Sequence, residues 1–169
     1  MPVNIAHFLT PKLFVATLYE DSTIRQGLEK MHFYHYTAVP VTTRENIYIG
    51  TVSEGDFLWY LVGKADSEDG ISLKDMEDLL LRDILKPDRY PPVPITVTVE
   101  ELLAQAMNRN FIPVVDGRGA FIGIVTRKAI MQYFADPAEE KGTPAAQVCP
   151  EIYPEGVNGK RETGYAGLL

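Results

Sequence analysis

Two short segments carry side chains that could bind an anion where a helix begins. Ser53 is followed three positions later by Asp56, and Thr126 stands directly before the cationic pair Arg127 and Lys128. Each hydroxyl residue follows an apolar run and precedes a helical pattern, so its simplest role is to cap a helix. A helix N-terminus that carries small polar residues also favours a negatively charged group such as phosphate. The two segments therefore predict candidate sites for a phosphate-bearing ligand.

The sequence lacks the short motifs of common enzymes. It has no Gly-rich phosphate loop ending in Lys-Ser/Thr, no His-Glu-x-x-His and no Gly-x-Ser-x-Gly. His32 and His35 stand three apart, but only His7 remains as a third imidazole. This pattern favours a helix cap or a cleft lining over a metal site. We therefore expect a binding protein that is not an enzyme and that requires no metal.

The elements that would position these residues occur twice in the chain. Residues 37–41, Thr-Ala-Val-Pro-Val, match residues 110–114, Asn-Phe-Ile-Pro-Val. The apolar strand around Gly50 matches the one around Gly123 at the same offset of 73 positions. An amphipathic helix precedes each Pro-Val strand, and a second helix follows each anion-binding segment. The chain is therefore a tandem repeat.

Each copy is predicted to run strand, helix, strand, strand, helix. The first strands are expected at 13–18 and 95–97. One such unit exposes an apolar face that it cannot bury alone, so two copies should pack together. We expect an α+β fold of two βαββα repeats related by a pseudo-two-fold axis. We assign 1–68 to the first repeat, 69–94 to a linker helix and an extended Pro-rich connection, 95–135 to the second repeat, and 136–169 to a disordered tail or docking arm.

This pattern resembles the CBS domain, and the two copies resemble a CBS pair, or Bateman module. The resemblance rests on the helix that ends near Met31, the Pro-Val strand, and the run hydrophobic-Gly-hydrophobic-hydrophobic-[Ser/Thr]-x-x-Asp, and it covers roughly residues 8–134. It implies a regulatory sensor that binds an adenosine-containing nucleotide between the repeats. It also implies that binding is transmitted to an effector protein, which the sequence leaves unknown.

The resemblance further implies a role for particular residues. The Asp of the motif accepts hydrogen bonds from ribose hydroxyls, the Ser or Thr contacts phosphate, and adenine lies against the first strand and the residues before Pro-Val. The residues that match these positions are Ala16, Thr17, Tyr36, Thr37, Ala38, Pro40, Ser53 and Asp56 in the first repeat and Thr126, Arg127 and Lys128 in the second. Ala129 stands where the second Asp is expected. We therefore expect AMP, ADP or ATP in the site of the first repeat.

A narrower resemblance suggests another ligand. Residues 36–38 before Pro40, and Thr126-Arg127-Lys128 without a following Asp, are similar to the stand-alone CBS-pair receptors for cyclic di-AMP of Gram-positive bacteria. In those receptors two adjacent basic residues meet the phosphates of the ligand. Asp56 departs from that pattern and favours an ordinary adenosine ligand. Cyclic di-AMP is thus the alternative ligand, and a ligand-free scaffolding or dimerisation pair is the third interpretation.

The composition and the net charge of the chain limit the kinds of partner that we expect. The formal net charge of −7 argues against DNA, whose phosphates require clustered Lys and Arg. The apolar runs are shorter than the roughly 20 residues of a spanning helix, and the N-terminus lacks the basic start of a signal peptide. We therefore expect a cytoplasmic protein without a membrane segment. The helices at 54–62 and 127–134 carry more apolar side chains than a small core needs, which predicts a homodimer.

Overall fold

The computed structural model describes residues 5–65 and 74–135, and the expectations for 66–73 and for the tail 136–169 lie outside the described residues. The α-helices are α1 (Ile24–Tyr34), α2 (Glu54–Ala65), α3 (Asp75–Asp78), α4 (Val99–Ala106) and α5 (Arg127–Ala135). The strands are β1 (Leu9–Pro11), β2 (Leu18–Tyr19), β3 (Ala38–Thr42), β4 (Tyr48–Ser53), β5 (Val93–Pro94), β6 (Phe111–Val115) and β7 (Phe121–Thr126). Short 3₁₀ turns are η1 (Ile5–His7), η2 (Lys12–Phe14), η3 (Leu81–Asp83) and η4 (Pro87–Arg89).

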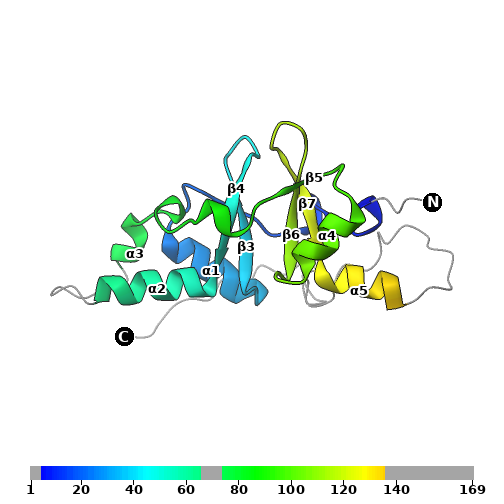
Figure 1. Ribbon diagram of the computed structural model, residues 1–169. Coiled ribbons are helices and arrows are strands. Elements are labelled where there is room, and N and C mark those ends of the chain that lie inside the picture. Colours follow the sequence, from blue (N-terminus) through cyan, green and yellow to red (C-terminus); the bar gives the residue numbers. More distant parts are fainter. Residues whose placement is uncertain (1–4, 66–73, 136–169) are drawn as a thin grey trace, which may run out of the picture.

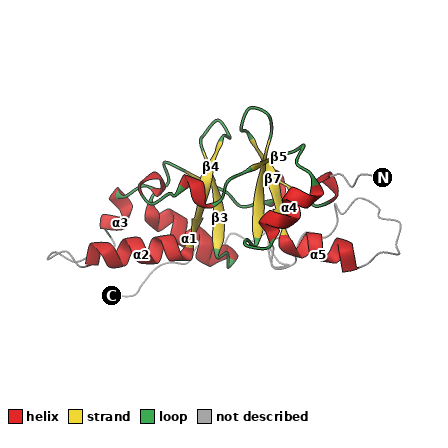
Figure 2. Cartoon of the chain, in the orientation of Figure 1, coloured by secondary structure: helices red, strands yellow, loops and turns green. Residues whose placement is uncertain are grey.

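The strands form two sheets that stand side by side at the centre of the molecule (Figures 1 and 2). One sheet has the order β2-β3-β4 and the other β1-β7-β6-β5. Helices α1, α2 and α3 lie beside the first sheet, and α4 and α5 lie beside the second (Figure 1). Each repeat thus runs β-α-β-β-α, which confirms the predicted fold class.

Equivalent residues begin the first helix of each repeat. Thr23 accepts a hydrogen bond from the backbone N–H of Gln26, and the Gln26 side chain accepts one from the backbone of Thr23. Thr98 and Glu101 make the same reciprocal pair at the start of α4. Such a capping box satisfies backbone donors that a helix start leaves without partners. The sequence therefore places both helix starts by local chemistry alone.

The hairpins of the two repeats share one register. Pro40 of β3 pairs with Thr51 of β4, and Pro113 of β6 pairs with Ile124 of β7, an offset of 73 in each strand. The register also shifts at the same point, after Val41 in the first hairpin and after Val114 in the second. Irregularities that recur at one offset show that the repeat extends to backbone detail.

A local two-fold axis passes between the hairpin turns. The backbone N–H of Tyr48 donates to the carbonyl of Gly119, and that of Phe121 donates to the carbonyl of Asn46, at 3.0 and 2.8 Å. Tyr48 and Phe121 are equivalent at the offset of 73, and so are Asn46 and Gly119, so the axis exchanges the two bonds. Five buried side chains pack where the sheets meet, namely Tyr48, Phe111, Val115, Phe121 and Ile124.

The first strand of each repeat is shorter than predicted and is displaced. The strand expected at 13–18 is only Leu18–Tyr19, because residues 12–14 form η2 and the Leu13 side chain is 82 % exposed. The strand expected at 95–97 is instead Val93–Pro94. There the Val97 N–H donates to the Pro94 carbonyl, so the chain already turns toward the cap of α4.

Two segments join the repeats in ways that local patterns did not indicate. β1 pairs antiparallel with β7, so the N-terminal segment forms the edge of the second sheet. The segment after α3 packs onto the first repeat, where Leu81 is fully buried and its N–H donates to the Ser22 carbonyl. The connection expected to be extended contains η4, which places Arg89 and Tyr90 between the repeats.

Candidate functional site

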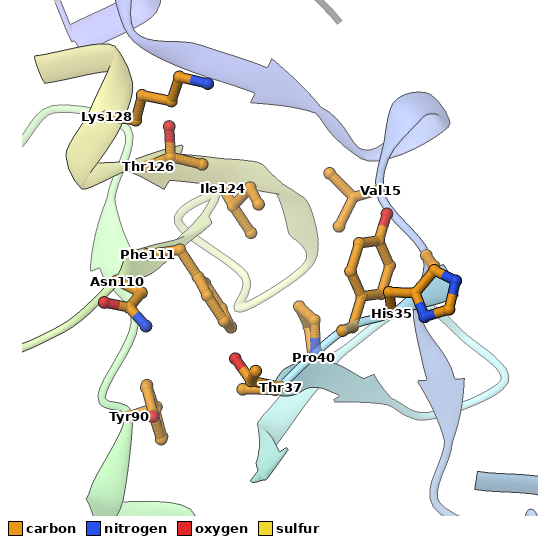
Figure 3. A pocket seen from close by; sticks show the side chains of 13 residues that line it. Val15, His35, Thr37, Pro40, Tyr90, Asn110, Phe111, Ile124, Thr126 and Lys128 are labelled. Atoms are coloured by element: carbon orange, nitrogen blue, oxygen red, sulfur yellow. The ribbon is translucent and has the colours of Figure 1, made fainter. Parts of the chain in front are cut away.

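A cavity of about 340 Å³ lies between the two repeats (Figure 3). The first repeat contributes the segments before β2 and between α1 and β3, and the second contributes the starts of β6 and α5. Thirteen residues line it: Val15, Ala16, His35, Tyr36, Thr37, Ala38, Pro40, Tyr90, Asn110, Phe111, Ile124, Thr126 and Lys128. None of these lining residues is acidic, which makes the cavity suitable for an anion.

Aromatic side chains form the walls of the cavity. Phe111 is stacked on Tyr90 with ring centroids 5.7 Å apart and an angle of 16° between the ring planes. Tyr36 is stacked on Tyr34 in the same way, at 5.5 Å and 14°. The hydroxyl of Tyr48 donates to the backbone carbonyl of Tyr90 at 2.8 Å and so holds the Tyr90 segment in place. Rings fixed from behind can offer a flat apolar surface to a planar ligand group.

The start of α5 forms a polar and cationic part of the cavity. Thr126 ends β7, and its Oγ1 accepts a hydrogen bond of 3.1 Å from the backbone N–H of Ala129. Lys128 lies in the first turn of α5, and Figure 3 shows its side chain above Thr126. The helix N-terminus and the ammonium group both attract negative charge. A phosphate group can therefore be held at this part of the cavity.

The structure brings seven of the eleven sequence-predicted residues together in the cavity wall. These are Ala16, Tyr36, Thr37, Ala38, Pro40, Thr126 and Lys128. Thr17, Ser53, Asp56 and Arg127 are not among the lining residues. The carbonyl of Thr17 accepts a hydrogen bond of 2.6 Å from Lys30 Nζ, whose pKa is lowered because the amine is partly buried.

Six lining residues were not among those predicted: Val15, His35, Tyr90, Asn110, Phe111 and Ile124. The repeat itself carried a signal for Asn110 and Phe111, because they occupy the positions of Thr37 and Ala38 one repeat later. His35 adopts the left-handed conformation at the end of α1, with φ 54°, and also lines the cavity. His35 thus has both roles expected from the sequence: it ends a helix and it lines a cavity.

Asp56 is buried at the start of α2, outside the cavity lining. Its Oδ2 accepts hydrogen bonds from the backbone N–H and the hydroxyl of Ser53 at 2.9 and 2.6 Å. Its Oδ1 accepts from Arg89 Nη1 at 2.6 Å, and Lys86 Nζ lies 3.5 Å away. Burial raises the pKa of the Asp56 carboxyl, but the Ser53 hydrogen bonds and the cations outweigh this effect and hold the pKa below its usual value.

The corresponding position of the second repeat has no such group. Ala129 is the counterpart of Asp56, so the start of α5 contains no carboxylate that could bind an arginine. The two helix starts therefore differ: Arg89 reaches over the start of α2, whereas the cavity adjoins the start of α5.

The fold defines a tandem-repeat module with a cavity between its repeats, and the comparisons place it in a family. The CBS domain family matches residues 6–63 and 81–136. A CBS domain protein from Streptococcus pneumoniae TIGR4 is similar, with 31 % identity, a TM-score of 0.69, and coverage of 76 % of this chain and 84 % of that chain. The chain belongs to the CBS domain family, and its two repeats form a CBS pair.

More distant solved structures share the fold. One is the CbpB protein of Listeria monocytogenes in complex with c-di-AMP, at 22 % identity and a TM-score of 0.69, covering 78 % of this chain and 94 % of that chain. Another is CBSX2 in complex with AMP, at 21 % identity and a TM-score of 0.63, covering 78 % and 96 %. The chain thus resembles CBS pairs that bind nucleotides. No curated protein matches the chain in sequence.

Two further features of the described residues bear on the expected partners. Within residues 5–65 and 74–135, no helix is long and apolar enough to cross a membrane. In the same ranges, no group of three or more His, Cys, Asp or Glu side chains is arranged to hold a metal ion.

Proposed function

We propose that this CBS pair is a regulatory sensor, without catalytic activity, that binds an adenosine-containing nucleotide in the cavity between its repeats. One observation supports the proposal most strongly: a single cavity joins stacked aromatic walls to the start of α5 with Lys128. In the proposed complex the adenine lies against the face of Tyr36, whose ring is stacked on Tyr34. The phosphate lies near Thr126 and Lys128, where the helix dipole and the ammonium charge both favour it.

The size of the cavity supports AMP, ADP or ATP as the ligand. Its volume of about 340 Å³ is near the lower end of the roughly 300 to 1,000 Å³ of small-molecule pockets. A ligand with one adenosine unit fits a cavity of this size, and the open mouth of the cavity leaves room for a larger one. The ribose hydroxyls would meet hydroxyl, amide and backbone groups, because Asp56 is not in the cavity wall.

Cyclic di-AMP is the second candidate ligand, and a specific observation favours it. The lining has no carboxylate for a ribose diol but does carry Lys128 beside Thr126, which suits a ligand recognised mainly by its phosphates. The CbpB structure in complex with c-di-AMP has the same fold.

Calorimetric titration of AMP, ADP, ATP and cyclic di-AMP tests the proposal. At least one ligand should bind the wild type, and Lys128→Ala should weaken it by about 1.5 to 3 kcal/mol, or roughly tenfold to a hundredfold. The matched control is Lys74→Ala, an exposed lysine outside the cavity, which should bind as the wild type does. If none of the four ligands binds, the proposal is wrong and the scaffolding interpretation takes its place.

The variant Asp56→Asn distinguishes nucleotide binding in the cavity from nucleotide binding at the site expected in the first repeat. Because Asp56 is buried against Ser53 and Arg89, the variant should keep its affinity for a ligand that binds in the cavity. Loss of all nucleotide binding in Asp56→Asn, with the fold intact by circular dichroism, would instead support a site at the start of α2.

We also propose that a second copy of the chain covers an exposed apolar face formed by α2 and α5. The side chains of Trp59 and Met131 are 69 % and 64 % exposed, and Leu58, Val62 and Phe134 are exposed as well. The two helices run along the same side of the molecule (Figure 1). A homodimer would bury this face, and nucleotide binding at the start of α5 could then be transmitted through the helix to the effector protein.

A further inference from the structure

The 3₁₀ turns η2 and η4 are equivalent segments of the two repeats. β2 begins at Leu18 and β5 begins at Val93, and each pairs in parallel with the Pro-Val strand of its own repeat at equivalent residues. The two strands are therefore equivalent at an offset of 75 positions. The bounds of η2 and η4 differ by the same 75 positions. Phe14, the last residue of η2, is thus the equivalent of Arg89, the last residue of η4.

These two equivalent residues stand in different surroundings. Arg89 Nη1 donates to the buried carboxylate of Asp56 at 2.6 Å and lies 3.4 Å from the hydroxyl oxygen of Ser53. The corresponding pair in the other half of the molecule is Phe14 and Ala129, of which Phe14 is 39 % exposed. A phenylalanine and an alanine form no ion pair. This pair therefore does not fasten η2 to the start of α5, which adjoins the cavity.

The second repeat also has larger side chains where the first repeat leaves room for the cavity. Ala38 lines the cavity, whereas its equivalent Phe111 is only 8 % exposed and packs between the sheets. Tyr90 is the equivalent of Val15, and its ring is stacked on Phe111. Two small side chains of the first repeat thus correspond to two stacked rings in the second. The symmetry-related counterpart of the cavity therefore has less space for a ligand.

Resting on the proposed function, we propose that Arg89 is a built-in closure of the nucleotide site expected at the start of α2, so that the chain binds one nucleotide and not two. Arg89 holds the Asp56 carboxylate in place of a ligand. A ribose that bound there would first have to displace this charged hydrogen bond. The cavity stays open because the equivalent residues, Phe14 and Ala129, form no such pair.

Moving the closure to the cavity tests this assignment. The double variant Phe14→Arg/Ala129→Asp places the same two residue types beside the start of α5 without a change in net charge. Calorimetry uses AMP, ADP, ATP or cyclic di-AMP, whichever binds the wild type most tightly. Ala129→Asp alone should weaken binding, because it adds a carboxylate near the phosphate. The double variant should bind about tenfold more weakly still, because the ligand must then break a charged hydrogen bond.

Charge alone predicts the opposite order. Without a closure, the added arginine would offset the added carboxylate, and the double variant would bind more tightly than Ala129→Asp. The matched control is Leu13→Arg/Ala129→Asp, because Leu13 is 82 % exposed and is not the equivalent of Arg89. This control should bind at least as tightly as Ala129→Asp. Circular dichroism shows whether each variant is folded.

The wild type should bind one ligand molecule per chain. Two ligand molecules per wild-type chain, or a folded double variant that binds at least as tightly as Ala129→Asp, would overturn the role of Arg89. In both cases a nucleotide still binds, so the proposed function stands. If the double variant is unfolded, the stoichiometry of the wild type decides. If none of the four ligands binds the wild type, the closure falls together with the proposed function.

Discussion

Arg89 covers the buried carboxylate of Asp56: its Nη1 lies 2.6 Å from Oδ1, while the Asp56 side chain is only 2 % exposed. Asp56 also accepts hydrogen bonds from Ser53. The arginine belongs to the connection between the repeats, and the aspartate belongs to the first turn of α2. This ion pair therefore fastens the connection to the first repeat, next to Tyr90 in the cavity wall.

Arg89→Ala should lower the free energy of unfolding by about 1 to 3 kcal/mol, because a buried carboxylate loses a charged hydrogen-bond donor. Urea denaturation measures this change. Lys86→Ala is the control: Lys86 lies 3.5 Å from the same carboxylate and is 62 % exposed, so its loss should cost less than about 1 kcal/mol. Equal effects of the two substitutions would contradict a special role for Arg89.

Asp56 should make the stability of the protein depend on pH in the acid range. Its pKa is lower in the folded protein than the ordinary value of 3.8. The unfolded chain therefore binds the proton first as the pH falls, and the stability from this group, complete above pH about 4, is lost as the pH falls toward the folded pKa. Denaturation midpoints measured from pH 6 downward should fall less steeply for Asp56→Asn than for the wild type. If the midpoints of the wild type and of Asp56→Asn fall equally with pH, the Asp56 carboxyl does not contribute to the pH dependence of stability.

Gly123→Ala should disrupt the pairing of β1 with β7. A Cβ atom at this position would lie 2.1 Å from the backbone oxygen of Thr10, so a strand must move. We expect a loss of stability of about 1 to 3 kcal/mol, as for other overpacked sites, by thermal or urea denaturation.

Gly63→Ala is the matched control for Gly123→Ala. Nothing lies within 4 Å of the added methyl group, and the residue is in α2. Alanine favours a helix over glycine by about 1 kcal/mol, so this substitution should be neutral or stabilising. If both substitutions were neutral, β1 would not be packed against β7 as described.

Trp59→Glu and Phe134→Glu should each shift the proposed homodimer toward monomer, because a charge would be buried in the apolar face of α2 and α5. Light scattering at micromolar concentration measures the mass. Met107→Glu is the control, since Met107 is 80 % exposed and follows α4, which does not belong to that face. A wild-type protein that is already monomeric under these conditions would refute the dimer.

The sequence alone determined the repeat and most of its elements. The offset of 73 residues, the capping boxes at Thr23 and Thr98, and the Pro-Val strands are signals that act within a few residues, so they can be recognised without coordinates. The same local signals placed the two helix starts at which an anion was expected. They did not locate the short first strands, because those depend on partners far along the chain.

The sequence showed that Ala129 replaces Asp at the second helix start, but only the tertiary structure decided which group Asp56 binds. Arg89 and Asp56 are 33 positions apart, and nothing in the local pattern around either residue indicates that they meet. Likewise, β1 joins the second sheet although it lies in the part of the chain assigned to the first repeat, because strand pairing across a distance is set by packing of the whole domain. Near the start of α5, the segment that follows β1 places Val15 and Ala16 in the same cavity wall as Thr126 and Lys128. At the equivalent position of the first repeat, Arg89 instead forms an ion pair with Asp56.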